Sequence, residues 1–330
     1  MKHQERIANA LAGKPTDRVP FGFWRHYPNE DRAPRRLAEL MAQAQLRLDL
    51  DFIKFMPYGL FSVVDWGVPL KLFEGLLDPP IQAAYPVRKA EDWAALKPIR
   101  GDGGEYAVVL EAQRLCLKEL HGRAPFLQTV FSPLTSALKL AGEEVLLRHL
   151  RDNPGRLEAG LEIISETTCQ FAAAAVERGA DGLFFASQVS GSDKLSRIEF
   201  ETFAKKYDFR VLAAVAGRAW FNILHLHGSK PRMAESLDYP VEAFNWHDRD
   251  RGPSLAEVRR LTGKCLVGGL GQEGKLTSGN PEEAAGQVAD AWRQLDGLGL
   301  IVGPGCVANT RTPEANIQAV KCAVEVTGRG

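Results

Sequence analysis

The chain has 330 residues, of which 45% are hydrophobic and 25% are charged, and its 41 basic residues balance 41 acidic ones. A net charge of zero argues against nucleic acid or an anionic membrane as a partner, because either would need a surplus of basic groups. No run approaches the ~20 apolar residues of a membrane span, and the polar N-terminus lacks the apolar core of a signal peptide. We therefore expect a cytoplasmic enzyme.

The five cysteines are scattered and include no CxxC pair; they are Cys116, Cys169, Cys265, Cys306 and Cys322. An odd number of dispersed cysteines favours reduced thiols over a disulfide framework. This agrees with the expected cytoplasmic location.

Short apolar strands alternate with longer amphipathic helices along the chain. The pattern predicts helices at about residues 4–12, 34–48, 105–120, 143–150, 155–178, 198–216, 230–237, 255–261 and 281–295, and a closing helix that begins at Thr312 and Pro313. It predicts strands at residues 18–24, 51–56, 125–131, 181–187, 220–228, 241–248, 265–270 and 299–306. Pro20 weakens the expected pairing of the first strand.

Eight strands in alternation with helices predict a closed (β/α)8 barrel, or TIM barrel, as one domain over residues 1–330. Parallel strands joined by right-handed crossovers must be covered by helices, and eight of them close well. A long proline-rich insertion follows the second strand, and we expect it to be functional because long loops in compact domains usually are. A doubly wound open sheet is the alternative, but no GxGxxG follows an early strand.

Two histidines at the end of the fifth predicted strand are the strongest chemical signal. Side chains repeat with period two along a strand, so His225 and His227 point to the same side. Two neutral imidazoles on one side are a natural half of a Zn2+ site. The alternative is that they cap neighbouring carbonyl groups or bind an anionic substrate.

Cys306 is the candidate for the remaining protein ligand. Catalytic groups of a barrel gather at the carboxyl ends of its strands, and Cys306 follows the last strand in the segment Gly-Pro-Gly-Cys. The small residues allow close backbone approach and leave the thiol exposed to the cavity. His225, His227 and Cys306 with an open fourth position are typical of a catalytic zinc. The alternative for Cys306 is a small buried packing residue.

Further candidates lie at the same ends of the strands. His247 or Asp248 is expected to orient an imidazole or to carry a proton, or else to complete its strand with local hydrogen bonds. Arg25 is expected to clamp a substrate carboxylate, with a surface ion pair as the alternative. Tyr58 and Gln188 are the other expected substrate-binding residues.

Several segments resemble the uroporphyrinogen decarboxylase superfamily. They are Arg18-Val19-Pro20, Ala180-Asp181-Gly182, the His-x-His-Gly segment and the terminal Gly-Pro-Gly-Cys followed by Thr-Pro-Glu-Ala-Asn. The similarity covers nearly the whole chain. It implies a (β/α)8 barrel from one of two branches: cofactor-free decarboxylases of uroporphyrinogen, or zinc-dependent methyltransferases that pass methyl groups between corrinoid proteins and thiols or other acceptors.

The decarboxylase branch fits the chain poorly. Its arginine-rich segment RQAGRYLPEYR corresponds to residues 24–32, where only Arg25 and Arg32 match. Its essential aspartate, in an FSDIL segment, falls near residues 56–58, which include no carboxylate. The pyrrole N–H groups of uroporphyrinogen need such a central acceptor.

The methyltransferase branch fits better, with one departure. Its His-x-Cys-Gly and Pro-Gly-Cys segments correspond to residues 225–228 and 304–306, and His227 stands where the family has cysteine. A neutral imidazole in place of a thiolate raises the charge of the site by one, so the metal is a stronger Lewis acid but a bound thiolate is less nucleophilic. This favours an alcohol, an ether or a carboxylate over a thiol as the expected acceptor.

The resemblance therefore implies a zinc-dependent methyltransferase that activates a small acceptor, with a corrinoid protein as donor or recipient. The sequence does not fix the oligomeric state, and a homodimer is one possible state. Two other classes also remain open. One is a metal-free decarboxylase in which His225, His227 and Arg25 bind carboxylates, and the other is a non-catalytic subunit that binds a corrinoid or porphyrin.

Overall fold

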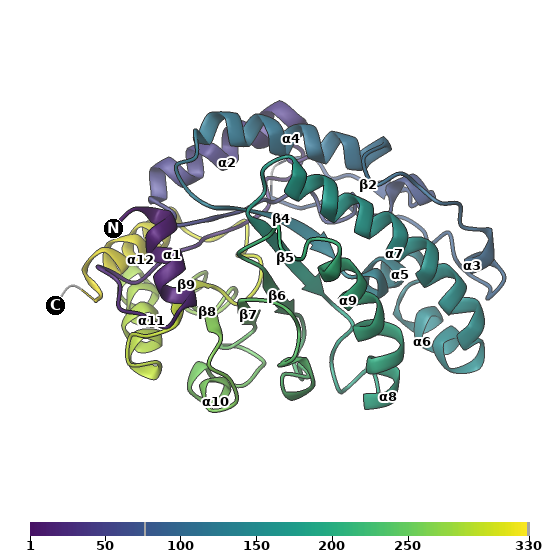
Figure 1. Cartoon of the computed structure of the whole chain (residues 1–330). Coiled ribbons are helices and arrows are strands. Elements are labelled where there is room, and N and C mark those ends of the chain that lie inside the picture. The colour runs from purple at the N-terminus through teal and green to yellow at the C-terminus, as the bar shows by residue number, and fades with distance from the viewer. Residues whose placement is uncertain (76, 329–330) are drawn as a thin grey trace.

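A curled sheet of seven parallel strands forms the centre of the molecule (Figure 1). The computed structural model describes residues 1–75 and 77–328. The strands lie in the order β1 (Ile53–Lys54), β4 (Phe126–Phe131), β5 (Gly182–Ser187), β6 (Ile223–Leu226), β7 (Ala243–Trp246), β8 (Cys265–Leu270) and β9 (Leu300–Pro304). Each of the seven strands pairs in parallel with the next one in this order, so all their carboxyl ends meet at one edge of the sheet.

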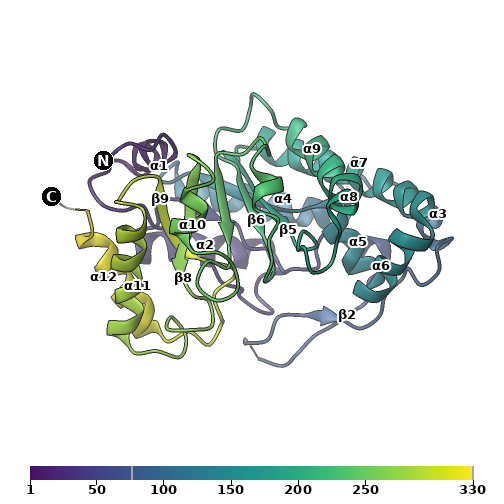
Figure 2. The ribbon, with the colours of Figure 1, turned by 90° about the horizontal axis from the view of Figure 1, so that it is seen from below.

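Helices follow most of the strands and cover the sheet. They are α1 (His3–Leu11), α2 (Pro34–Leu48), α3 (Asp92–Ala95), α4 (Gly104–Leu120), α5 (Pro133–Ala141), α6 (Glu143–Asp152), α7 (Pro154–Glu177), α8 (Arg197–Glu199), α9 (Lys206–Ala213), α10 (Leu255–Arg259), α11 (Pro281–Gln294) and α12 (Glu314–Val326), with short 3-10 or π turns η1 (Val64–Trp66), η2 (Phe200–Lys205) and η3 (Ala234–Ser236). Figure 2 shows α11 and α12 on one side of the strands and α5, α6 and α7 on the other. Within residues 1–75 and 77–328, every helix is too short or too polar to cross a bilayer.

The local signals in the sequence explain most of these elements. Strands β5 to β9 are buried along their whole length, as expected for parallel strands that are covered on both faces. At the start of α11, the Asn280 side chain accepts a hydrogen bond from the Glu283 N–H, and the Glu283 carboxylate accepts one from the Asn280 N–H. This reciprocal cap, with Pro281 at the first helical position, confirms the predicted helix start.

The first predicted strand, at residues 18–24, is the main error in the predicted fold. In place of a regular ladder, Phe21 makes an isolated bridge to Val302. Gly22 N donates to Val302 O at 2.9 Å, Val302 N donates to Pro20 O at 2.8 Å, and Asp51 N donates to Phe21 O at 2.8 Å. Pro20 has no N–H to donate, so regular pairing cannot continue through it. The two edges of the sheet, β9 and β1, are therefore joined only by single hydrogen bonds through this segment.

The buried carboxylate of Asp51 ties the N-terminal region to the sheet. It accepts hydrogen bonds from Arg6 at 2.5 Å, from Arg18 at 2.6 Å, from the Phe21 N–H at 2.8 Å and from His3 at 2.8 Å. Burial alone would raise the pKa of Asp51, but the His3 hydrogen bond and the charges of Arg18 and Arg6 lower it. Asp51 is therefore ionised and fully partnered in the folded chain.

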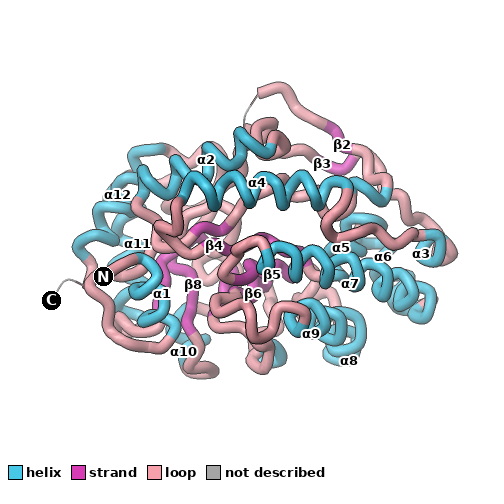
Figure 3. The backbone as a smooth tube through the Cα atoms, turned by 45° about the horizontal axis from the view of Figure 1, so that its top comes forward, coloured by secondary structure: helices cyan, strands magenta, loops and turns pink. Residues whose placement is uncertain are grey.

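The long insertion after β1 contributes to the cavity beside the sheet. It contains an antiparallel hairpin of β2 (Leu70–Lys71) and β3 (Ile81–Gln82), which lies at one edge of the molecule in Figure 3. Residues 79–82 line the cavity described below. An ion pair of 3.1 Å between Arg311 and Asp78 joins the insertion to the loop that follows β9. The insertion therefore forms part of the wall around the candidate site.

Candidate metal centre

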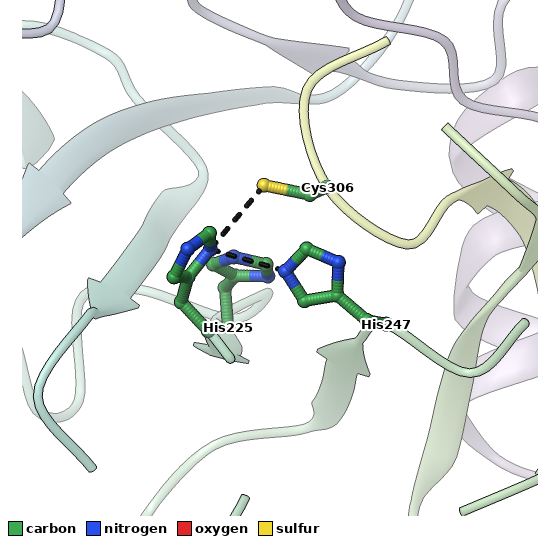
Figure 4. A group of neighbouring side chains, drawn as sticks. His225, His247 and Cys306 are labelled. Carbon is green, nitrogen blue, oxygen red and sulfur yellow. Dashed lines mark hydrogen bonds between the residues drawn. The ribbon is translucent and has the colours of Figure 1, made fainter. Parts of the chain in front are cut away.

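Four potential metal ligands converge at the carboxyl ends of three strands. His225 lies in β6 and His227 directly follows it, His247 directly follows β7, and Cys306 lies just beyond β9. One ligand atom from each of the four residues lies within 4.8 Å of those from the other three. Figure 4 shows His225, His247 and Cys306 pointing toward one another. The three ligands predicted from sequence are thus brought together, and His247 joins them.

The spacing of these atoms suits a single small metal ion. Nε2 of His247 lies 3.1 Å from Nδ1 of His227, and Sγ of Cys306 lies 3.6 Å from the same nitrogen. Tetrahedral ligands at ~2.0–2.3 Å from zinc are separated from one another by about 3.3–3.8 Å. Small side-chain movements would therefore place the four donors around one ion.

Asn245 fixes the orientation of His225. The Asn245 amide N–H groups donate to the backbone oxygens of Val267 and Pro304 at 2.8 and 3.1 Å, so the amide oxygen faces His225. That oxygen lies 2.6 Å from Nδ1 of His225 and can only accept. Nδ1 therefore carries the proton, and Nε2 keeps a free lone pair for a metal.

We expect Asn245→Ala to weaken zinc binding without removing a ligand. Loss of a hydrogen-bonding partner of a ligating histidine typically costs 10–100-fold in metal affinity. Zinc affinity can be measured by competition with a chromophoric chelator. Gln113→Ala is the control, because Gln113 is also a buried amide that donates to a backbone oxygen, that of Ala175, but it lies in α4. Equal zinc affinity in Asn245→Ala and the unmodified protein would contradict this role.

The environment of the cluster favours neutral imidazoles. Burial is the main cause that lowers the pKa of His225 well below its usual value, lowers that of His227, and lowers that of His247 to about 4. Burial also raises the pKa of Cys306, so metal binding must displace a proton from its thiol. Three neutral imidazoles and one sulfur form a donor set that fits zinc.

A cavity of about 290 Å³ lies beside the cluster, and His225 and Cys306 form part of its wall. This volume is at the small end of the range for ligand pockets. The other lining residues include Trp24, Lys54, Phe131, Lys139, Phe184 and Gln188, and none of the lining residues is Asp or Glu. Burial lowers the pKa of Lys54 to about 7 and that of Lys139 well below its usual value.

Two residues predicted to bind substrate lie outside this cavity. Arg25 is in a separate surface hollow, where its guanidinium lies 5.8 Å from the ring of Tyr27. Tyr58 is buried, and its ring lies 6.0 Å from the guanidinium of Arg32. Gln188 does line the cavity. Arg25 and Tyr58 therefore do not line this cavity, and their predicted role in substrate binding stays a prediction.

Asp248 and His247 lie in different surroundings. The Asp248 carboxylate accepts a hydrogen bond of 3.0 Å from the N–H of Gly269 and is not part of the cluster. His247 supplies a donor atom to the cluster itself. The role of Asn245 was missed, although it pairs directly with His225 across the sheet, and knowledge of that register would have identified it.

Comparisons with known proteins place the chain in a family. The family signature described as Uroporphyrinogen decarboxylase (URO-D) matches residues 2–326. The chain belongs to this family. A curated relative, methylcobamide:CoM methyltransferase MtaA of Methanosarcina barkeri (strain Fusaro / DSM 804), is 24% identical over 335 residues and is aligned over 96% of each chain.

Solved structures show the same fold. A methyltransferase from Methanosarcina mazei is 22% identical, with a TM-score of 0.84 and 98% of each chain covered. A B12-independent methionine synthase from Shewanella sp. W3-18-1, in complex with selenomethionine, is 12% identical, with a TM-score of 0.62 and coverage of 94% of this chain and 97% of that one. The resemblance expected from the sequence, including its methyltransferase branch, is confirmed.

Proposed function

We propose that this URO-D family member is a zinc-dependent methyltransferase that moves a methyl group between a small acceptor and a corrinoid protein. The main observation behind the proposal is the cluster of three imidazoles and one thiol on the wall of a small cavity. The methyltransferase class is supported by the MtaA relatives, whose name includes a methylcobamide. The proposal includes that the metal is zinc, that the acceptor is a small molecule and that a corrinoid protein is the partner.

We also propose that the chain is a single (β/α)8 barrel domain in which residues 18–24 occupy the position of the eighth strand. Their hydrogen bonds reach Val302 in β9 and Asp51 just before β1. In such a barrel the cluster lies at the carboxyl end of the strands, which is where barrel enzymes carry their active sites.

His225, His227 and Cys306 would hold the zinc, and Asn245 would keep His225 in its ligating tautomer. When bound, zinc supplies Lewis acidity that lowers the pKa of the acceptor heteroatom that gains or loses the methyl group. A pKa of about 4 makes the imidazole of His247 a weak proton acceptor at neutral pH. This favours His247 as a fourth donor, in the position that would otherwise be open to the acceptor, over its predicted role as a proton carrier.

His227 is the residue that we expect to tune the choice of acceptor. Three neutral imidazoles and one thiolate leave one net positive charge with Zn2+, whereas the family's second cysteine would cancel it. We expect His227→Cys to retain zinc and to raise the rate of methyl transfer to thiols several-fold, because a less positive centre leaves a thiolate more nucleophilic. Initial rates with matched thiol and alcohol acceptors would measure this. A lower rate with thiols would contradict the charge argument.

A metal-free decarboxylase of a carboxylated substrate is the second candidate, and the basic lining of the cavity favours it. The cavity of about 290 Å³ is small for a tetrapyrrole with eight carboxylates, so the substrate would be a smaller acid. Such an enzyme would work equally well after treatment with a chelator.

Zinc analysis and a methyl-transfer assay test the proposal together. Protein purified without a polyhistidine tag should contain about one zinc per chain. It should also demethylate methylcobalamin, followed by its absorbance, in the presence of an acceptor from a panel of small thiols, alcohols and acids. The rate should fall on chelation and return with added zinc. Full activity in zinc-free protein, or release of CO2 from a carboxylated substrate without zinc, would overturn the proposal.

A further inference from the structure

Two buried lysines face the cavity beside the metal centre. Lys54 and Lys139 are 4% and 8% exposed, and both line the cavity. Among the residues that the structure describes, neither ammonium group has a carboxylate within ion-pair distance, and no Asp or Glu lines the cavity. The cavity therefore holds two amines that have no anionic partner.

The surroundings of Lys54 leave its charge without a counterion. Lys54 ends β1, and its Nζ contacts the sulfur of Met56, which is a weak acceptor. Nζ also lies 4.5 Å from the ring centre of Phe184 and 5.7 Å from that of Trp24. Aromatic faces attract a cation but do not neutralise it.

Lys139 is in a similar position on the facing helix α5. Its Nζ donates a hydrogen bond of 2.6 Å to the backbone oxygen of Gly59 and lies over the ring of Phe131. An ammonium group has three N–H donors, so a single carbonyl acceptor leaves two without a partner. A lysine that serves only packing extends its ammonium group to bulk water, whereas this one remains buried and reaches the cavity.

Burying an ionised amine without a partner is strongly unfavourable, whereas an anion between the two amines would stabilise their protonated forms. Two buried amines that line one cavity without a carboxylate therefore form a site suited to an anion. We infer that Lys54 and Lys139 bind the acidic group of the substrate. The ligand class is a small carboxylic, sulfonic or phosphonic acid that also carries the metal-binding heteroatom. This inference rests on the proposed function for that heteroatom, but the acid subsite can be tested without the metal.

Calorimetric binding to the zinc-loaded protein tests the subsite, with 3-mercaptopropionate and its neutral analogue 3-mercaptopropanamide as probes. Charge-assisted hydrogen bonds from buried ammonium groups should favour the acid by at least about 10-fold. Lys54→Met and Lys139→Met keep the length of the side chain and remove its charge, so each should abolish most of this preference while zinc content stays unchanged. Lys264→Met is the control, because Lys264 contacts the Tyr239 backbone oxygen outside the cavity.

Equal affinity for the acid and the amide in the unmodified protein would overturn the inference, even if the variants failed to fold. An unchanged preference in both folded variants would overturn it as well. Butyrate and butyramide, tested on metal-free protein, separate the two proposals. If the protein never binds zinc but prefers butyrate, and this preference depends on the two lysines, the acid subsite is supported and the proposed metal chemistry is wrong. If methyl transfer depends on zinc but acids are not preferred, the proposed function is supported and the acid subsite is wrong.

Discussion

Replacing Cys306 with alanine is expected to abolish stoichiometric zinc and methyl transfer together. The sulfur is the only anionic donor in the cluster, since the other three ligand atoms belong to imidazoles whose pKa values are lowered by burial. Loss of a partner of a ligand already costs 10–100-fold in metal affinity, so loss of the ligand should cost at least about 100-fold. Zinc per chain after dialysis and the initial rate of methylcobalamin demethylation measure the two effects.

The control for Cys306→Ala is Cys265→Ala. Cys265 is a buried cysteine that begins β8 and therefore lies toward the opposite end of the strands from Cys306. This variant should keep its zinc and its activity, although a small cavity in the core should lower its stability. If Cys306→Ala retained full zinc, the ligand assignment would be wrong. If it lost zinc but kept its activity, the metal would have no part in the reaction.

Asp51→Asn is expected to have the largest effect on stability. The carboxylate is fully buried and receives hydrogen bonds from Arg6, Arg18, His3 and the Phe21 N–H. Removing one partner of a buried ion pair leaves uncompensated charge, which typically costs about 3–5 kcal/mol. Urea denaturation should therefore show a fall of this size in the free energy of unfolding.

The same carboxylate predicts a pH dependence. Because the folded pKa of Asp51 is lowered, its contribution to stability is present above the unfolded pKa of about 3.9 and is lost as pH falls through the folded value. The unmodified protein should lose this contribution in acid, and Asp51→Asn should lack that part of the decline. Asp49→Asn is the control, since Asp49 pairs with Arg18 at an exposed position and should contribute less than about 1 kcal/mol. Equal destabilisation by both substitutions would contradict the role of Asp51.

The parts of the site that could be predicted from sequence depend on short-range geometry. The period of two along a strand puts His225 and His227 on one side, and the parallel order of the strands brings Cys306 to the same edge. Helix starts such as Asn280 were predictable because capping involves only neighbouring residues.

Other features depend on contacts between distant segments and could not be predicted. The orientation of Asn245 is set by backbone oxygens in β8 and β9, which the local sequence does not show. Lys139 lies on a helix whose apolar pattern gives no sign that the lysine points into a cavity. Pro20 indicated that residues 18–24 would pair irregularly. How many hydrogen bonds they make depends on contacts with distant residues such as Val302 and Asp51, which the local sequence does not show.

X-ray absorption spectroscopy of the zinc-loaded protein would show whether Cys306 and the histidines bind one zinc ion. We expect about one zinc per chain, with one sulfur at ~2.3 Å and three nitrogen or oxygen neighbours at ~2.0–2.1 Å. The sulfur contribution should disappear in any zinc that Cys306→Ala retains. A protein that binds no zinc, or zinc without a sulfur neighbour, would contradict this ligand assignment.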